Sequence, residues 1–342
     1  MSAPIRTGIL GYGAVAHMHM KALALCPERI VTGVYGPNPE KAQAFARQYG
    51  ITAYPTRQAL LEASDCIHIC TPTGTHCQDI LDCFAMDKHV LCEKPLCMTD
   101  EECDIIRAAA EKARAKIMPV SQYRYSKTFA AVKKAVDSGA FGTLLSANVK
   151  MMYYRTPEYY RSAPWRGTVK EDGGVLMTQA LHGIDVTLGI VGKPVCVTAM
   201  AKTMLHDIEA PDTAVALAET ESGAAVIFET STASAPGYPR QYCFSGTNGA
   251  VEMLEETIAR WDIPGKEELE LPVGKQELLS GASDPMNLDS SLHAAQFTDF
   301  SNQILHDAAP HYTLADGIRT VKFINAIFRS QKEDRKVRLT DI

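Results

Sequence analysis

The sequence predicts an α/β protein with two domains, each built around its own β-sheet. A length of 342 residues exceeds what one typical hydrophobic core contains, which favours two domains. In roughly the first third of the chain, short apolar runs alternate with helical patterns, as is typical of a parallel sheet covered by helices on both faces. Further on, β-rich runs follow one another without a long helical pattern, which predicts an open, largely antiparallel sheet. We place the two domains at residues 1–123 and 124–342.

The elements can be predicted in chain order. In the first domain, apolar runs predict strands at Ile5–Leu10, Ile30–Tyr35, Cys66–Cys70, His89–Cys92 and Ile117–Val120. Helices are predicted between them at Ala14–Leu25, Glu40–Tyr49 and His76–Met86, and from a capping box at Thr99 to about Lys112. A helix near Phe129–Ser138 leads out of this domain. The second domain is predicted to contain a long strand at Leu144–Met152, one helix over Gly173–Gly192, β-rich runs at Val195–Thr203, Thr213–Glu219, Ala224–Ser231, Arg240–Ser245 and Ala250–Leu254, and two final helices at Ser290–His306 and Leu314–Gln331.

The composition indicates neither a nucleic acid nor a membrane as partner. The net charge is −6, and neither a signal peptide nor an apolar run of about 18 residues is visible, so a cytoplasmic protein is expected. Seven of the ten cysteines lie between Cys66 and Cys103, but they form no Cys-x-x-Cys pair and match no zinc spacing. We interpret them as free thiols in the core. Histidines and acids show no metal-ligand spacing either, so no metal is predicted.

A glycine loop predicts that the first domain is a Rossmann domain that binds a dinucleotide. The pattern Gly11-x-Gly13-x-x-Ala16 follows a strand and opens a helix, which is the arrangement that holds a pyrophosphate at a helix N-terminus. The predicted cofactor contacts here are Gly11, Tyr12, Gly13, Ala14 and Val15.

The second half of the dinucleotide fingerprint is missing. Where an acid would bind the ribose, the chain reads Tyr35-Gly36-Pro37-Asn38, with Lys41 one turn further on. Tyr35, Gly36, Asn38 and Lys41 are kept as cofactor candidates, although an ordinary turn explains the same residues. The choice between NAD and NADP therefore stays open.

Three motifs together resemble the Gfo/Idh/MocA family of sugar and inositol dehydrogenases. They are the glycine loop followed by His19, the segment Cys70-Thr-Pro-Thr-Gly-Thr-His76, and Glu93-Lys94-Pro95 after a strand. The resemblance continues in the segment from Gly173 to His182 and Asp185, and it covers essentially the whole chain. It implies a Rossmann domain, a second domain whose open sheet often forms the interface of a homodimer or homotetramer, and hydride transfer between a nicotinamide and a secondary alcohol of a sugar or cyclitol.

Oxidation of an alcohol requires a base and a positive group near the reacting oxygen. Lys94 follows a parallel strand, where such sheets bind ligands, and the resemblance places it beside nicotinamide and substrate. His182 has a side chain suited to proton transfer near neutral pH. Thr178, four residues earlier, stands where the family often has an Asp that assists the histidine. We therefore predict Lys94, His182 and Thr178 as catalytic residues, with a surface lysine and a core or capping histidine as the alternatives.

Further site residues are predicted from the resemblance and from residue chemistry, and among them Asp185 could instead orient His182 or cap local backbone. The predicted cofactor contacts, besides the glycine loop and the four candidates after it, are Thr71, Pro72, Thr73, His76, Glu93, Lys94, Gln122, Trp165 and Arg166. The predicted substrate contacts are Lys94, Arg124, Tyr153, Arg155, Asp185 and His182. Tyr153 and Arg155 belong to an aromatic and cationic loop suited to sugar rings, carboxylates or phosphates, for which surface packing or a subunit contact is an equal alternative.

Three functions are compatible with these residues. The leading hypothesis is an NAD(P)-dependent dehydrogenase or reductase of a sugar, sugar derivative or cyclitol. The second is a glycosidase or lyase that oxidises a sugar hydroxyl transiently and then eliminates. The third is a non-enzymatic dinucleotide-binding regulator, which the retained Lys94 and His182 disfavour.

Overall fold

The computed structural model describes residues 3–264 and 290–339. Contacts divide the chain into two compact units, Met1–Gln122 with Asp289–Ile318 and Tyr123–Leu288 with Arg319–Ile342. The division predicted from the sequence places 290–318 in the second domain, whereas contacts group these residues with the first unit. Within the described ranges, no helix has the length and apolar character needed to cross a membrane.

The first unit is built on a six-stranded parallel sheet with the strand order β3-β2-β1-β4-β5-β6. This is the order of a Rossmann domain, so the predicted fold of this unit is confirmed. Because all strands are parallel, their carboxyl ends meet at one edge, where such sheets bind ligands. The strands are β1 (Ile5–Leu10), β2 (Arg29–Tyr35), β3 (Thr52–Ala53), β4 (Cys66–Ile69), β5 (His89–Cys92) and β6 (Ile117–Pro119).

Three helices of this unit begin after a residue whose side chain bonds a free backbone N–H group. Asn38, Thr56 and Thr99 each accept a hydrogen bond from the third residue that follows, and Thr99 forms the predicted capping box with Glu102. The helices are α1 (Ala14–Leu23), α2 (Pro39–Tyr49), α3 (Arg57–Glu62), α4 (His76–Ala85), α5 (Asp100–Lys112) and α10 (Ser291–His306). Helix α10 packs into the same core as α1 through Phe297 and Phe300, both fully buried.

The second unit contains an eight-stranded sheet in the order β13-β12-β11-β7-β10-β9-β8-β14. Only β7 and β10 pair in parallel, and the other neighbours are antiparallel, which confirms the predicted open, largely antiparallel sheet. The strands are β7 (Leu144–Met152), β8 (Pro194–Lys202), β9 (Thr213–Thr220), β10 (Ala225–Ser231), β11 (Gln241–Gly246), β12 (Gly249–Leu254), β13 (Thr257–Asp262) and β14 (Val337–Arg338).

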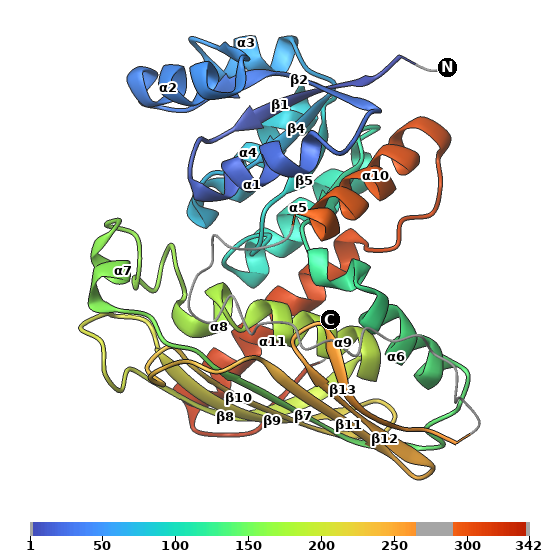
Figure 1. Ribbon diagram of the computed structural model, residues 1–342. Coiled ribbons are helices and arrows are strands. Elements are labelled where there is room, and N and C mark those ends of the chain that lie inside the picture. The colour runs from blue at the N-terminus through green and yellow to red at the C-terminus, as the bar shows by residue number, and fades with distance from the viewer. Residues whose placement is uncertain (1–2, 265–289, 340–342) are drawn as a thin grey trace. The chain divides into compact units, whose positions relative to one another are not determined.

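Helices cover one face of this sheet, as Figure 1 shows for α9 and α11. Ala147, Val149 and Met151 of β7 are fully buried, while Asn148 and Lys150 between them are exposed. This alternation is that of a strand with one covered and one open face. The helices of the unit are α6 (Lys127–Asp137), α7 (Pro157–Arg161), α8 (Gly174–Thr178), α9 (Leu181–Val191) and α11 (Leu314–Glu333).

The single helix predicted over Gly173–Gly192 is wrong, because the chain forms two helices, α8 and α9, with a break between them. At the break the backbone N–H of Ala180 donates to the carbonyl of Val175, five residues back, at 2.8 Å. The Thr178 hydroxyl donates to the carbonyl of Gly174 at 2.6 Å. A wide turn and a hydroxyl that bonds the preceding turn both bend helices. Thr178 and His182 therefore do not share the face of one helix.

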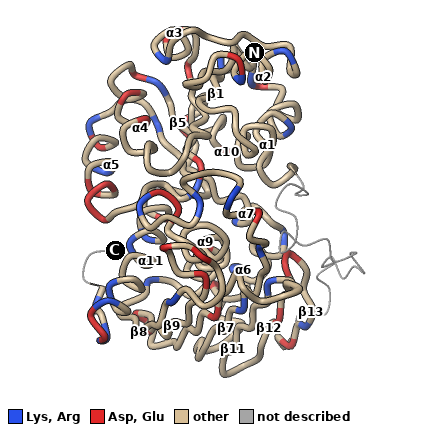
Figure 2. Tube along the Cα trace, turned by 90° about the vertical axis from the view of Figure 1, so that its left-hand side faces the viewer, with Lys and Arg blue, Asp and Glu red and all other residues tan. Residues whose placement is uncertain are grey.

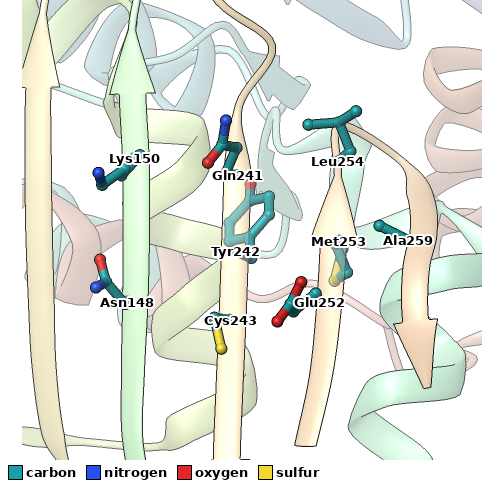
Figure 3. A pocket seen from close by; sticks show the side chains of 9 residues that line it. All are labelled: Asn148, Lys150, Gln241, Tyr242, Cys243, Glu252, Met253, Leu254 and Ala259. Carbon is teal, nitrogen blue, oxygen red and sulfur yellow. The ribbon is translucent and has the colours of Figure 1, made fainter. Parts of the chain in front are cut away.

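The open face of the sheet carries a shallow hollow of about 320 Å³ over β7, β11, β12 and β13 (Figure 3). Its lining is mostly polar at one end, where Asn148, Lys150 and Gln241 lie, and includes Met253 and Leu254 at the other. None of the predicted site residues lines this hollow. Figure 2 shows basic and acidic residues interspersed along both units.

Candidate active site

The loop after β1 has the backbone that a bound pyrophosphate requires. Gly11 has a φ of +103°, and a Cβ atom there would lie 2.6 Å from the carbonyl oxygen of Cys70. Its N–H donates to the carbonyl of Tyr35 at 2.8 Å. At Gly13, which precedes α1, a Cβ would meet no atom within 4 Å. Ala16 is fully buried, so α1 packs closely, and open backbone at this helix N-terminus fits a phosphate group.

The end of β2 is occupied by contacts within the protein. A Cβ at Gly36 would lie 2.1 Å from the ring of Tyr12, so the position of this ring requires a glycine at residue 36. The Tyr12 hydroxyl accepts from the backbone N–H of Asn38 at 3.1 Å, and the Asn38 side chain accepts from that of Lys41 at 3.0 Å. Asn38 thus caps α2, and no carboxylate replaces the missing acid of the fingerprint at Tyr35-Gly36-Pro37-Asn38. The other predicted residues of the glycine loop, Ala14 and Val15, form the exposed and half-buried first turn of α1.

The segment from Thr71 to His76 after β4 contacts the loop at Pro95 through a hydrogen bond. Buried Asp79 accepts from the Thr71 hydroxyl at 2.6 Å and pairs with Arg57 at 2.6 Å. The buried ring of His76 places Nδ1 2.8 Å from the carbonyl oxygen of Pro95 and Nε2 2.9 Å from that of Thr71. His76, predicted as a cofactor contact, thus connects two loops. The two predicted contacts beside it are more accessible, namely Pro72, which is exposed, and Thr73, which is half-buried.

Lys94 is held through the residues on both sides of it. Glu93 is 5% exposed, and its Oε2 accepts from the backbone N–H of Lys94 at 3.0 Å. Its Oε1 lies 2.8 Å from Nε2 of His19. Burial would raise the pKa of Glu93, but the hydrogen bond to His19 is the largest cause that lowers it, to about 2. The Lys94–Pro95 peptide is cis, and the Pro95 carbonyl contacts His76. Lys94 itself is half-buried at the carboxyl end of β5, where ligands of parallel sheets bind.

The backbone at the carboxyl end of β6 is bonded by Gln296, a residue that the sequence analysis did not predict. The amide of Gln296 on α10 donates to the carbonyl of Pro119 at 2.8 Å, and its oxygen accepts from the N–H of Ser121 at 3.0 Å. Nothing local announces this role, because Gln296 and Pro119 are 177 residues apart. The predicted cofactor residue Gln122 follows directly. It is buried, and its Oε1 has no hydrogen-bond partner among the described residues.

In the second unit, His182 is half-buried at the start of α9 and packs on Tyr123. The two rings meet edge to face, with centroids 5.0 Å apart. The guanidinium of buried Arg240 lies 4.4 Å from the centroid of the Tyr123 ring and pairs with Glu255 at 3.0 Å and Glu256 at 2.6 Å. Burial raises the pKa of Tyr123 to about 12, so its hydroxyl stays neutral near physiological pH. His182 therefore packs against the neutral ring of Tyr123, and the Arg240 guanidinium packs against the same ring.

Thr178, the third predicted catalytic residue, uses its hydroxyl within its own helix. The hydroxyl donates to the Gly174 carbonyl at 2.6 Å and contacts the amide of Gln179. The Gln179 amide in turn donates to the Tyr159 hydroxyl at 3.0 Å. Thr178 thus connects the glycine-rich entrance with the aromatic loop.

Arg124 and Asp185, both predicted as substrate contacts, bind each other. Arg124 Nε donates to Asp185 Oδ2 at 2.8 Å, and its Nη2 donates to Oδ1 at 3.1 Å. The Thr320 hydroxyl donates to the same Oδ1 at 2.9 Å. Asp185 is fully buried and Arg124 is 6% exposed. Gly189 makes room for the pair, because a Cβ there would lie 1.6 Å from Nη1 of Arg124.

The aromatic and cationic loop forms a compact cluster. Arg155, which is buried, has its guanidinium 5.5 Å from the centroid of the Tyr159 ring and 5.9 Å from that of Tyr153. Arg166 lies 4.1 Å from the centroid of Tyr159 and 4.6 Å from that of Trp165. Burial raises the pKa of Tyr153. The predicted substrate and cofactor residues of this loop therefore lie together around one tyrosine ring.

The cysteines are structural in character. All ten are free thiols, and most are buried. Burial raises the pKa of several of them, including Cys70 and Cys92, which disfavours the reactive thiolate. Over residues 3–264 and 290–339, His, Cys, Asp and Glu side chains form no group that could hold a metal ion.

Comparison with known proteins agrees with this geometry. The model of the oxidoreductase family with an NAD-binding Rossmann fold matches residues 5–120, and the model of the GFO/IDH/MocA C-terminal domain matches residues 129–252. An inositol 2-dehydrogenase of Rhizobium meliloti (strain 1021) is 30% identical over 72% of this chain and 74% of its own length. The scyllo-inositol 2-dehydrogenase (NADP(+)) IolW of Bacillus subtilis (strain 168) is 24% identical over 98% of this chain and 96% of its own.

Among solved structures, the WlbA dehydrogenase of Bordetella pertussis in complex with NADH and UDP-GlcNAcA superposes with a TM-score of 0.87 and 25% identity, covering 99% of this chain and 100% of that chain. The likeness therefore extends over both units and includes the cofactor-binding fold. The chain belongs to the GFO/IDH/MocA family of NAD-binding oxidoreductases.

Proposed function

We propose that this enzyme transfers a hydride between a nicotinamide and a secondary hydroxyl or keto group of a sugar, sugar derivative or cyclitol. The observation that carries the proposal is the placement of Lys94, a half-buried amine at the carboxyl end of β5 whose backbone is fixed by Glu93. The inositol dehydrogenases named above and the UDP-sugar acid bound to WlbA support this substrate class.

Lys94 and His182 have complementary roles in this proposal. A bound nicotinamide supplies the hydride acceptor or donor. The Nζ ammonium of Lys94 donates a hydrogen bond to the substrate oxygen and stabilises the charge that develops there. His182 accepts the hydroxyl proton during oxidation and returns it during reduction. We assign this transfer to Nε2 of His182, because its Nδ1 is buried.

The other predicted residues are proposed to support these two. Gly11 and Gly13 bind the pyrophosphate, and Gln122 offers the cofactor amide a carbonyl oxygen that has no partner in the described part of the chain. Asp185 and Arg124 stabilise the fold of this unit rather than contact the substrate, since they already bond each other. The segment Tyr35-Gly36-Pro37-Asn38 at the end of β2 contains neither a carboxylate nor an arginine, so the choice between NAD and NADP stays open.

A substrate panel tests the proposal. The purified protein is mixed with NAD+ or NADP+ and with myo-inositol, scyllo-inositol, glucose 6-phosphate or a UDP-sugar acid, and reduced nicotinamide is followed at its absorption band. We expect Lys94→Ala and His182→Ala to lose at least about 100-fold in kcat while NADH binding, measured by fluorescence, is retained. Lys112→Ala and His306→Ala, both exposed at helix ends, serve as matched controls. Normal turnover of both site variants would refute the assignment.

The open face of the sheet is proposed as a subunit interface of a homodimer or homotetramer. Cross-strand neighbours on this face are apolar and exposed: Leu217 (54%) pairs with Ile227 (38%), and Val215 (40%) pairs with Met200 (47%). A contiguous exposed apolar patch of this kind is typical of a contact surface. The mass of the particle in solution, from light scattering coupled to size exclusion, tests this.

A further inference from the structure

A row of buried polar side chains runs through the first unit to Glu93, and its members come from four different elements. His19 lies on α1, Arg29 begins β2, His68 lies in β4, and Glu93 follows β5. His19 and His68 are fully buried, while Arg29 is 6% and Glu93 is 5% exposed. We call these four residues the imidazole chain: Arg29, His68, His19 and Glu93.

The contacts along the imidazole chain are continuous. Arg29 Nη1 lies 3.2 Å from Nε2 of His68. Nδ1 of His68 lies 2.9 Å from Nδ1 of His19, and Nε2 of His19 lies 2.8 Å from Oε1 of Glu93. The other oxygen of Glu93 accepts from the backbone N–H of Lys94. Each histidine therefore uses both ring nitrogens, and the row ends at the backbone of Lys94.

Only one arrangement of protons satisfies every contact. A guanidinium can only donate and a carboxylate can only accept, so Nε2 of His68 accepts from Arg29 and Nε2 of His19 donates to Glu93. His68 then carries its proton on Nδ1 and donates it to Nδ1 of His19. Both rings are neutral in this arrangement, and all donors point from Arg29 towards Glu93.

A protonated His19 would disrupt the row. Its Nδ1–H would have to donate to Nδ1 of His68, and the His68 proton would move to Nε2. That proton would face the N–H groups of Arg29, so two donors would oppose each other. Burial, with His19 and Arg29 as further causes, lowers the pKa of His68 well below its usual value, in agreement with a neutral ring.

The imidazole chain also explains how the buried guanidinium of Arg29 is accommodated. Among the described residues, Arg29 forms no direct ion pair. Its guanidinium donates to the hydroxyls of Ser301 and Thr7 at 2.8 and 3.3 Å and to the Phe297 carbonyl at 3.3 Å. Phe297 also covers the two imidazoles, with ring centroids 5.0 Å from His19 and 4.7 Å from His68. Arg29 is thus anchored from several sides, and the charge that balances it is Glu93, reached through two neutral rings.

We propose that the imidazole chain positions Lys94 for the reaction. This inference rests on the proposed function, in which Nζ of Lys94 bonds the substrate oxygen. Lys94 takes its backbone position from Glu93, and Glu93 takes its own from His19 and, through His68, from Arg29. The four residues are positioning residues, because their contacts reach Lys94 through the hydrogen bond between its backbone N–H and Glu93.

The proton order is tested on the unmodified protein. Long-range 1H–15N spectra of 15N-labelled protein report which ring nitrogen of each histidine carries a proton, and the spectra of His19→Gln and His68→Gln assign the signals. At neutral pH we expect His19 as the Nε2–H form and His68 as the Nδ1–H form. A doubly protonated ring at either position, or a proton on the other nitrogen of either ring, would overturn the proton order proposed for the imidazole chain.

The positioning role is tested by kinetics on the substrate that turns over fastest in the panel. We expect His68→Phe, which keeps a ring but breaks the row, to lower kcat about 10- to 100-fold, with KM and the NADH Kd changed less than about threefold. His68→Gln, whose amide can accept from Arg29 and donate to His19, should restore most of kcat. Ile67→Ala, at a neighbouring fully buried position of β4, is the matched control and should lower Tm without this loss of kcat.

The outcomes separate this inference from the proposed function. If Lys94→Ala loses turnover while His68→Phe keeps it within about threefold, the positioning role is refuted and the proposed function stands. If Lys94→Ala turns over normally, the proposed function fails and the positioning role fails with it. A loss in His68→Phe that Ile67→Ala reproduces would also overturn the positioning role, because loss of packing would then account for it.

Discussion

The buried pair of Arg124 and Asp185 offers a decisive test of what these residues do. Replacement of Asp185 by Ala removes two hydrogen bonds from Arg124 and one from Thr320, and takes the carboxylate away from a buried guanidinium. Breaking a buried ion pair in this way costs about 3–5 kcal/mol of unfolding free energy. For a domain of this size class, about 1 kcal/mol lowers Tm by roughly 2–4 °C, so a fall of about 6–20 °C is expected.

Calorimetry and steady-state kinetics together form the assay. We expect Asp185→Ala to lower Tm strongly while kcat, measured well below the new Tm, stays within about fivefold of the unmodified enzyme. Gly189→Ala should give a similar loss of Tm, because its Cβ would displace the Arg124 guanidinium. Asp137→Ala breaks the exposed pair with Lys133 on α6 and is the matched control, with little change expected.

A double replacement separates charge from packing. Arg124→Met combined with Asp185→Leu removes both charges at once and should be more stable than Asp185→Ala alone, because no uncompensated charge remains buried. The reasoning would be refuted if Asp185→Ala kept its Tm within about 3 °C and lost turnover. Asp185 would then be a substrate contact, as predicted from the sequence.

Further predictions follow from the same structure. Gly11→Ala should raise the NADH Kd at least tenfold, measured by fluorescence titration, because its φ of +103° and its close neighbour exclude a Cβ. Acid should destabilise the protein through His68, because folding lowers the pKa of this histidine below its usual value of 6.5. Below pH 6.5 the unfolded chain therefore binds a proton that the folded protein does not bind. The free energy of unfolding then falls by up to about 1.4 kcal/mol for each unit by which the pH decreases. His68→Gln should flatten that part of the curve of Tm against pH, and an unchanged curve would contradict it. Leu217→Arg on the open face should convert an oligomer to monomers in light scattering, whereas Lys150→Arg should not.

The architecture was predictable because hydrophobic periodicity reports directly on burial. The strands His89–Cys92 and Leu144–Met152 begin and end where the apolar pattern predicted. The capping box at Thr99 was equally visible, since its two side chains are three residues apart. Signals of this kind are local, and local signals survive in a single sequence.

Long-range partners were not predictable. The pattern of α10 indicated a buried face but not that this face packs beside α1, nor that Arg29 would bond Ser301, 272 residues away. The break between α8 and α9 was missed for a related reason. The pattern from Gly173 to Gly192 is mostly apolar, and the break accompanies a wide turn at Ala180 and the bond of the Thr178 hydroxyl to the Gly174 carbonyl, neither of which periodicity predicts.

Burial explains why the motif residues divide into two roles. A motif marks residues of suitable chemistry, but a side chain that is fully enclosed and already bonded within its own unit has no capacity left for a ligand. Asp185, His76 and Glu93 are enclosed in this way, and each holds a backbone group or an ion partner. Lys94 and His182 remain partly exposed, and each is held by such a neighbour: Lys94 by Glu93, and His182 by the ring of Tyr123. The residues that act on substrate are therefore expected among the accessible members of each motif, and the enclosed members fix their geometry.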